Sequence, residues 1–440
     1  MNFSNILKSR LVLVCLFLFA FTKDANAYLD PGSGNALVCL FLSLIGAFFY
    51  YLKSFFYRIV LKIKGEQYTQ KLDEQVALFS EGKNYWYTYK PIVEKLIDKK
   101  IPFIYYTMDF EDPALRIDNK FMHSKYVGSG NRGFAKIGSL KTKLLITTTP
   151  NIGCPEYPLR RPSKVKKLCH VWHSICDSSC YHLGALDHYD VALTVGKWVE
   201  EPLRTIEQIR KIKTKEIIPV GLPYFDLLKS IYDRRITEQA EVKTFNSDQN
   251  NKPKVILLAP SWGAKSCLRT YGTEFIHKAI ENGYQIILRP HPQTLKVEGE
   301  FLKKLQNEFK YTSQVKFDFN PDATDSMMKS DMMISDKSGV RFDYALIYEK
   351  PVLTLDVPAT SLDEYEAILL GRLWGEDEAK FIGTKLQPNQ KEQIMDSVEK
   401  TLQFKSEDIK MLRDNVLVNY GSSADKIVEW VKSEISEHNS

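Results

Sequence analysis

The fold is decided by two apolar runs, which read VILLAP at residues 255–260 and YQIILRPHP at residues 284–292. Each run is short, rich in branched apolar residues and closed by proline, which predicts a buried β-strand. The segment Thr273–Asn282 between them has the apolar spacing of a helix. A strand, a helix and a second strand in this order predict a parallel βαβ unit with a right-handed crossover.

The same alternation extends in both directions from this unit. Further helices are predicted at 91–99, 301–310 and 340–348, with residues 326–329 at the end of another. Further strands are predicted at 102–108, 144–149, 168–172, 191–195, 216–220, 315–319, 332–335 and 351–355. The chain is also too long for one ordinary hydrophobic core. The sequence therefore predicts an α/β protein with two facing Rossmann-like doubly wound domains, preceded by an N-terminal membrane segment.

The expected domain boundaries follow changes in composition. Residues 67–237 form a predicted N-terminal Rossmann-like acceptor domain, and the polar stretch 238–252 has few structure signals and is predicted to be a linker. Residues 253–404 form a predicted C-terminal Rossmann-like domain for a donor nucleotide. The amphipathic helices expected at 405–440 could cross back to the first domain.

The N-terminus indicates attachment to a membrane. Basic residues precede the apolar run Leu11–Phe21, and small residues end at Ala27, so residues 1–27 resemble a secretory signal or a first membrane helix. Residues 36–64 contain a second apolar run with a basic flank, which predicts a membrane helix whose flank stays in the cytoplasm. A shallow interfacial helix is the alternative. Both readings place the protein at the inner (cytoplasmic) membrane, with the catalytic domains facing the cytoplasm.

Charge and cysteine usage narrow the class of function. A net charge of +6 over 440 residues is modest and argues against a dedicated nucleic-acid binder. Seven cysteines is an odd number, and a cytoplasmic location would keep those of the soluble part reduced. Cysteines and histidines gather at 169–188, but their spacing fits no paired Cys-x-x-Cys pattern, so no metal site is predicted.

Arg289 and His291 follow a predicted strand and are framed by two prolines. Strand ends of a doubly wound sheet point into the ligand crevice, and prolines prevent the sheet from continuing. A guanidinium beside an imidazole suits a phosphate or diphosphate. The alternative is a histidine that caps a helix beside an ion-paired arginine.

The loop 335–339, which reads SDKSG, connects a predicted strand to a predicted helix. Small polar residues at the start of a helix leave N–H groups free, and these groups bind anions. Simple capping by Asp336 or Ser338 is the alternative. In the first domain, His173 follows the predicted strand 168–172 and would supply a base for an acceptor hydroxyl, with a structural histidine as the alternative.

These features together resemble the CDP-glycerol glycerophosphotransferase family, which contains the teichoic-acid-type polymerases and primases. The motifs that carry the resemblance are, in chain order, 145–150 (LITTTP), 172–173 (WH), 221–223 (GLP), 259–262 (APSW), 289–292 (RPHP), 335–338 (SDKS), 342–343 (FD) and 350–351 (KP). The likeness covers roughly residues 140–360 and is strongest after Val255.

The resemblance implies two facing domains of the GT-B type and transfer of glycerol phosphate from CDP-glycerol to a hydroxyl of a lipid-linked acceptor, with release of CMP. By similarity, His173 matches the proposed base, and Arg289 and His291 match contacts to the donor phosphates. Ser338 matches the first serine of the family's donor-binding loop, which corresponds here to residues 335–339 and is called the donor loop below. The predicted catalytic residues are His173 and His291, and the predicted donor-binding residues are Arg289, Ser335, Asp336, Ser338, Gly339, Asp343, Ser261 and Trp262.

Three departures from the family pattern leave the transferred group open. Ser174 replaces the glycine of Trp-His-Gly, Gly339 replaces the second serine of the donor loop, and Tyr224 stands where an arginine often follows Gly-x-Pro. The expected activity is therefore transfer of glycerol phosphate or a related polyol phosphate from a CDP-alcohol to a lipid-linked or cell-surface glycan. No cofactor is expected apart from this donor substrate. A GT-B glycosyltransferase that uses a sugar nucleotide and a non-catalytic membrane-anchored scaffold are the alternatives.

Overall fold

The computed structural model describes residues 75–243, 253–358 and 364–436. The signal-like segment 1–27 and the membrane helix 36–64 predicted from the sequence lie outside these ranges. Within them, no helix combines the length and the apolar content that crossing a membrane requires.

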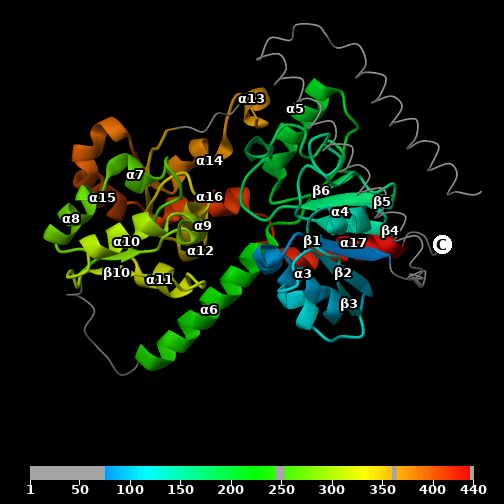
Figure 1. The fold of residues 1–440 in the computed structure, drawn as a ribbon, viewed down its shortest axis with the longest axis horizontal. Coiled ribbons are helices and arrows are strands. Elements are labelled where there is room, and N and C mark those ends of the chain that lie inside the picture. The colour runs from blue at the N-terminus through cyan, green and yellow to red at the C-terminus, as the bar shows by residue number, and fades with distance from the viewer. Residues whose placement is uncertain (1–74, 244–252, 359–363, 437–440) are drawn as a thin grey trace, which may run out of the picture. The chain divides into compact units, whose positions relative to one another are not determined.

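The first domain contains a seven-stranded parallel sheet with the order β3-β2-β1-β4-β5-β6-β7 (Figure 1). Its strands are β1 (Val76–Ser80), β2 (Phe103–Thr107), β3 (Met122–Tyr126), β4 (Lys141–Thr147), β5 (Lys164–Val171), β6 (Val191–Thr194) and β7 (Glu216–Pro219). The order reverses between β1 and β4, which makes the carboxyl ends of these strands the switch point where ligands bind in such sheets. The connecting helices are α3 (Trp86–Asp98), α4 (Gly130–Gly138), α5 (Glu200–Arg210) and α6 (Pro223–Lys243).

The second domain contains a six-stranded parallel sheet with the order β10-β9-β8-β11-β12-β13. Its strands are β8 (Val255–Ala259), β9 (Gln285–Leu288), β10 (Val315–Phe317), β11 (Met332–Ser335), β12 (Val352–Leu355) and β13 (Gly383–Leu386). Its helices are α7 (Cys267–Tyr271), α8 (Glu274–Glu281), α9 (Pro292–Val297), α10 (Gly299–Glu308), α11 (Thr324–Lys329), α12 (Val340–Tyr348), α13 (Ala367–Leu370), α14 (Trp374–Asp377) and α15 (Ile394–Leu402). Here the switch point lies between β8 and β11.

Two parallel sheets of this kind confirm the predicted pair of doubly wound α/β domains. The central strands β1, β2, β8 and β11 are buried along nearly their whole length, as expected when helices cover both faces of a parallel sheet. On one face of the first sheet, α3 contributes the buried Tyr89 and Ile92 to the core.

Two helices complete the C-terminus, α16 (Ser406–Val416) and α17 (Ser423–Ser436). Although α17 ends the described chain, it packs on the first domain, where Ile427 and Val431 join the core beside α3 (Figure 1). Its first N–H groups, those of Ser423 and Ala424, donate to the carboxylate of Asp226 on α6. The last helix therefore extends the core of the first domain.

The close approach of this returning segment explains the glycine of the Gly-Leu-Pro motif. Gly221 has a φ of +97°, and a Cβ at this position would lie 2.3 Å from the carbonyl oxygen of Val418. A larger residue would therefore be both strained and in collision with the chain that returns from the second domain.

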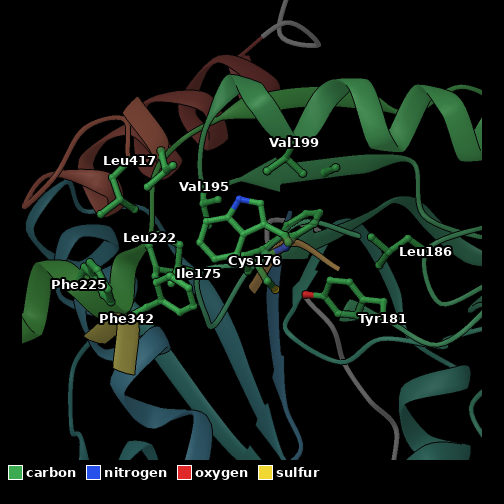
Figure 2. Close-up of a cluster of buried hydrophobic side chains, with 14 of the residues drawn as sticks. Ile175, Cys176, Tyr181, Leu186, Val195, Val199, Leu222, Phe225, Phe342 and Leu417 are labelled. Carbon is green, nitrogen blue, oxygen red and sulfur yellow. The ribbon is translucent and has the colours of Figure 1, made fainter. Parts of the chain in front are cut away.

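The junction between the domains is apolar. Phe225 on α6 and Phe342 on α12 belong to one buried cluster with Leu222 and Leu417 (Figure 2). The helix α6 extends to Lys243, so residues 238–243, which the sequence assigns to a linker, are helical. The predicted linker contains no proline and only polar or helix-compatible residues in this part, which allows the helix to continue.

Candidate functional site

The carboxyl ends of β8, β9 and β11 are neighbours in the second sheet, so the loops that follow them lie together. These loops carry Ser261 and Trp262, Arg289 and His291, and residues 335–339. Most of the predicted donor-binding residues therefore meet at the switch point of one sheet.

Asp336 holds two of these loops in a fixed relation. Its buried carboxylate accepts hydrogen bonds from the N–H of Ser261 at 3.0 Å, from the Ser261 hydroxyl at 2.8 Å and from the N–H of Cys267 at 2.9 Å. The hydroxyl of Ser335, which is also buried, donates to the carbonyl of Ala259 at 2.7 Å. Both side chains therefore hold the loops in place, because their polar atoms already form hydrogen bonds within the protein.

His291 presents one defined nitrogen. Its Nδ1 accepts a hydrogen bond of 3.1 Å from the N–H of Gln293 and so caps α9. An acceptor Nδ1 places the proton of the neutral ring on Nε2. Among the described residues, Nε2 has no hydrogen-bond partner, so it is a donor available to a ligand.

The surroundings of His291 favour this neutral form. Burial lowers the pKa of the imidazole, and the nearby carboxylate of Asp336 opposes the shift only partly. Trp262, which is half exposed, stacks over the ring with their centroids 6.4 Å apart. The arrangement offers a neutral N–H donor beside an exposed aromatic face.

Arg289 points toward the neighbouring strand end. Its guanidinium forms an ion pair of 2.6 Å with Asp318 and donates to the carbonyl of Pro321 at 3.1 Å. Burial raises the pKa of Asp318, but hydrogen bonds from Ser326, from the N–H of Asn320 and from Arg289 outweigh it and lower the pKa. The capping histidine and the ion-paired arginine that formed the alternative interpretation are both present. Arg289 still retains further N–H groups that these two bonds do not use.

The N-terminus of α12 is open. Ser338 is half-buried and Gly339 is exposed, and no side chain in the described part of the protein caps the first N–H groups of this helix. A helix end of this kind binds anions through its free N–H groups and its dipole. It lies next to the loop that Asp336 anchors and is therefore close to His291.

Asp343 lies elsewhere. Its carboxylate accepts a hydrogen bond of 3.3 Å from the hydroxyl of Tyr224 on α6. Asp343 thus faces the junction between the domains, and the structure does not bring it together with His291.

His173 follows β5 in the first domain. Its ring makes an edge-to-face contact with Tyr85, with centroids 5.3 Å apart, and its Nδ1 is buried without a hydrogen-bond partner in the described part of the chain. Burial lowers its pKa to about 4, so the ring is neutral at pH 7 and able to accept a proton. His173 belongs to the first sheet, and no contact joins it to the residues around His291 within the described ranges.

The sequence did not indicate a polar group beside the switch point of the first sheet. Glu81 follows β1 and accepts a hydrogen bond from the hydroxyl of Tyr157. Burial and the charge of Glu81 raise the pKa of Tyr85, which in turn contacts His173. The signal available in the sequence was the change from the apolar run 76–79 to Ser-Glu-Gly at 80–82.

A cavity of about 900 Å³ lies between Trp198, Trp374, Phe381 and Met411, and it includes none of the predicted site residues. Across residues 75–243, 253–358 and 364–436, no three histidine, cysteine or acidic side chains converge in the manner of a metal site.

Known structures share this fold. The wall teichoic acid polymerase TagF matches with a TM-score of 0.54 and 16% identity, over 89% of this chain and 98% of that one. A UDP-GlcNAc 2-epimerase from Methanocaldococcus jannaschii matches with a TM-score of 0.53 and 16% identity, over 81% and 99%. A putative UDP-N-acetylglucosamine 2-epimerase from Listeria monocytogenes gives a TM-score of 0.54 and 14% identity, over 82% and 96%. At these identities the likeness concerns the fold alone.

Sequence comparison identifies the family more directly. No curated protein matches the chain. The family described as CDP-Glycerol:Poly(glycerophosphate) glycerophosphotransferase matches residues 183–432, which is more than half of the 440 residues. This range includes the loops that carry Ser261, His291 and Ser338. The chain therefore belongs to the CDP-glycerol:poly(glycerophosphate) glycerophosphotransferase family.

Proposed function

We propose that the protein transfers glycerol phosphate, or a related polyol phosphate, from a CDP-alcohol to a hydroxyl of a lipid-linked or cell-surface glycan and releases CMP. The observation that carries this proposal is the position of His291. Its Nε2–H has no partner among the described residues, its tautomer is fixed by the N–H of Gln293, and it lies near the N-terminus of α12 at the switch point of the second sheet.

In this proposal the donor diphosphate binds at the switch point. The N–H groups at the start of α12 and the Nε2–H of His291 donate to phosphate oxygens, and Trp262 offers an exposed ring beside them. Arg289 contributes the N–H groups that Asp318 and Pro321 leave unused. Asp336 and Ser335 keep the loops in place. These donors stabilise the charge that develops on the phosphates during transfer.

The chemical step balances as follows. The acceptor oxygen forms a bond to the β-phosphorus of the CDP-alcohol while the bond from that phosphorus to the bridging oxygen breaks. CMP leaves with the electron pair of the broken bond, and the acceptor proton passes to neutral His173. The proposal uses no metal ion and no cofactor other than the donor substrate.

The test measures CMP release from CDP-glycerol in the presence of a membrane or glycan acceptor. His291→Ala should lower the turnover by about 100-fold or more, the loss typical of one donor to a developing oxyanion. His277→Ala is the matched control, because His277 lies on α8 of the same domain and is exposed, with its ring nitrogen bonded to Glu308. Unchanged turnover in His291→Ala would remove the mechanism.

A donor screen separates the alternatives. Turnover of UDP-GlcNAc without turnover of CDP-glycerol would support a glycosyltransferase, which the fold shared with sugar-nucleotide epimerases makes worth testing. Tight nucleotide binding without any product would support a scaffold.

We also propose that the protein is attached to the inner membrane through residues 1–64, with both domains in the cytoplasm. The basis is the order of charged and apolar residues in that segment. A protease added to cells whose outer membrane has been opened should leave the domains uncut, whereas the same protease should cut them after the inner membrane is opened too. Cleavage before the inner membrane is opened would contradict this orientation.

A further inference from the structure

The connection between β12 and β13 leaves its own domain and contacts the first one. Residues 364–376 of this connection, which we call the bridge, lie against residues 177–187 of the loop that follows β5. The same loop carries His173 near its start, so the bridge contacts the element that carries the proposed base.

The bridge is attached to this loop by main-chain and side-chain bonds. The N–H of Leu183 donates to the carbonyl of Glu364 at 2.8 Å, and the N–H of Gly184 donates to the carboxylate of Glu366 at 2.9 Å. Closer to His173, Arg372 forms an ion pair of 2.8 Å with Asp177, whose side chain is fully buried. The N–H of Trp374 donates to the hydroxyl of Ser179 at 3.1 Å.

The far end of the bridge is attached to the donor loop. The carbonyl of Gly375 accepts a hydrogen bond of 2.5 Å from Arg341, which is only 2% exposed and lies in the first turn of α12. Glu376 forms ion pairs with Arg341 at 3.4 Å and with Lys337 of the donor loop at 3.8 Å. The bridge therefore connects the loop that carries His173 to the donor loop, which precedes α12.

We propose that Asp177 and Arg372 are positioning residues for the transfer, because their ion pair fixes the loop of His173 relative to the donor loop. The inference rests on the proposed function, since it assigns roles to both loops. Neither residue is expected to touch the substrate.

The burial of Asp177 makes this pair suited to positioning. Water does not reach the carboxylate of Asp177, so its charge depends on the guanidinium of Arg372. The loop cannot move away from Arg372 without leaving this buried charge unpaired. The other carboxylate oxygen of Asp177 accepts a hydrogen bond from the N–H of Ser179, and the hydroxyl of Ser179 accepts one from the N–H of Trp374. The ion pair with Arg372 and the hydrogen bond to Trp374 therefore hold the same part of the loop. A shift of about 1 Å in a reacting group can lower a rate by about 100-fold.

The first test is kinetic. Asp177→Asn keeps the acceptor for Ser179 and removes the charge, and Arg372→Gln removes the other partner. Each should lower kcat for CMP release by about 10- to 100-fold while the KM for CDP-glycerol stays within about two-fold, because donor-loop contacts are unchanged. The double variant should lose no more than the worse single variant, since both act through one pair.

The matched control is Arg413→Gln. Arg413 also forms an ion pair of 2.7 Å, with Glu349, and is mostly buried, but it joins α16 to the far end of α12. This variant should retain kcat. An equal loss of kcat in Arg413→Gln, or normal kcat in both Arg372→Gln and Asp177→Asn, would overturn the proposal.

The second test uses amide hydrogen exchange and does not depend on turnover. In the free protein, Arg372→Gln should speed exchange at Leu183 and Gly184, whose N–H groups bond to the bridge. CDP-glycerol should slow exchange at residues 335–341 in both proteins, but at residues 179–184 only in the protein that retains Arg372.

The outcomes separate the two claims. If CDP-glycerol slowed amide exchange at neither 335–341 nor 179–184, the result would count against the proposed donor site and so against the proposed function. Protection at 335–341 together with equal protection at 179–184 in Arg372→Gln would overturn the positioning role alone. Unchanged exchange of Leu183 and Gly184 in the free variant would also contradict it.

Discussion

The hydroxyl of Tyr224 on α6 donates a hydrogen bond of 3.3 Å to the carboxylate of Asp343 on α12 and so joins the two domains. The family resemblance implies an arginine at this position, so Tyr224 is a neutral donor where a cation is expected. Burial raises the pKa of Asp343 to about 7, and the bond from Tyr224 opposes this shift only in part.

This raised pKa predicts a stability that depends on pH. The folded protein holds the Asp343 proton up to about pH 7, whereas the unfolded chain loses it near the ordinary value of 3.8. The folded state binds more protons between these values, so this group makes the protein less stable as the pH rises through that window. Asp343→Asn should remove the dependence, so that its stabilising effect is larger at pH 8 than at pH 5 by roughly 2–3 kcal/mol.

Thermal unfolding of both proteins at pH 5 and pH 8 tests this expectation. The melting temperature of Asp343→Asn should exceed that of the natural protein mainly at pH 8. An equal difference at the two pH values would contradict the raised pKa.

Lys350, which the resemblance placed in a family motif, has a structural role. Its Nζ donates to the carbonyls of Met327, Met328 and Ser330 at 3.1, 2.6 and 2.6 Å and so closes the end of α11. Lys350→Met should remove these three bonds and destabilise the protein by about 1–3 kcal/mol, since the hydroxyls of Ser330 and Tyr344 still donate to the carbonyls of Met327 and Ser330. Urea unfolding measures the loss, and Lys303→Met, at an exposed lysine, should change stability little. Equal stabilities would show that water replaces the lysine.

Gly339 replaces the second serine of the donor loop without any steric need. Its φ is −60°, and a Cβ at this position would meet no atom within 4 Å. Gly339→Ser should therefore fold normally and, by adding a hydroxyl at the start of α12, bind CDP-glycerol up to about 10-fold more tightly.

Calorimetric titration of CDP-glycerol measures this effect, and Gly383→Ser provides the contrast. A Cβ at Gly383 would lie 2.0 Å from the carbonyl oxygen of Val352 on the neighbouring strand, so that variant should fail to fold. Loss of stability in Gly339→Ser would show that the glycine is required for the backbone.

The sequence predicted most of the buried strands because they are continuously apolar, but it did not predict β1 (Val76–Ser80), which is fully buried at the centre of the first sheet. The run Val255–Ala259 is β8, and the predicted strand 332–335 is β11. The edge strands β3 and β13 were missed because one side of each faces solvent, so Met122–Tyr126 and Gly383–Leu386 carry polar residues and no apolar run. Fold class follows from the alternation of strands and helices along the chain, which is why it could be predicted although β1, β3 and β13 were missed.

The candidate site could be located from the sequence, but the direction of its side chains could not. Position after a strand predicted that Arg289 and His291 lie at the sheet edge, since this follows from chain order alone. The partner of Arg289 is Asp318, which follows the next strand, β10, 29 residues further along the chain, and the ion pair itself leaves no pattern in the sequence. The contact between Asp177 and Arg372 likewise joins residues far apart in the chain and leaves no pattern in the sequence.

The last prediction concerns the acid limit of the reaction. Burial alone lowers the pKa of His173 to about 4, and no carboxylate within the described ranges forms a hydrogen bond with its Nδ1. The ring is therefore neutral, and able to accept the acceptor proton, at any pH well above 4.

If His173 is the base, kcat/KM should remain level from pH 8 to about 5.5, instead of falling near the ordinary histidine pKa of about 6.5. The pH profile of CMP release measures this, and thermal unfolding at the same pH values separates loss of activity from a change in stability. NMR titration of the His173 ring, assigned by loss of its signal in His173→Asn, should give a midpoint near 4. A midpoint between 6 and 7, with a matching fall in kcat/KM, would mean that the ring is hydrated or paired with an acid during the reaction, and the buried neutral base would have to be abandoned.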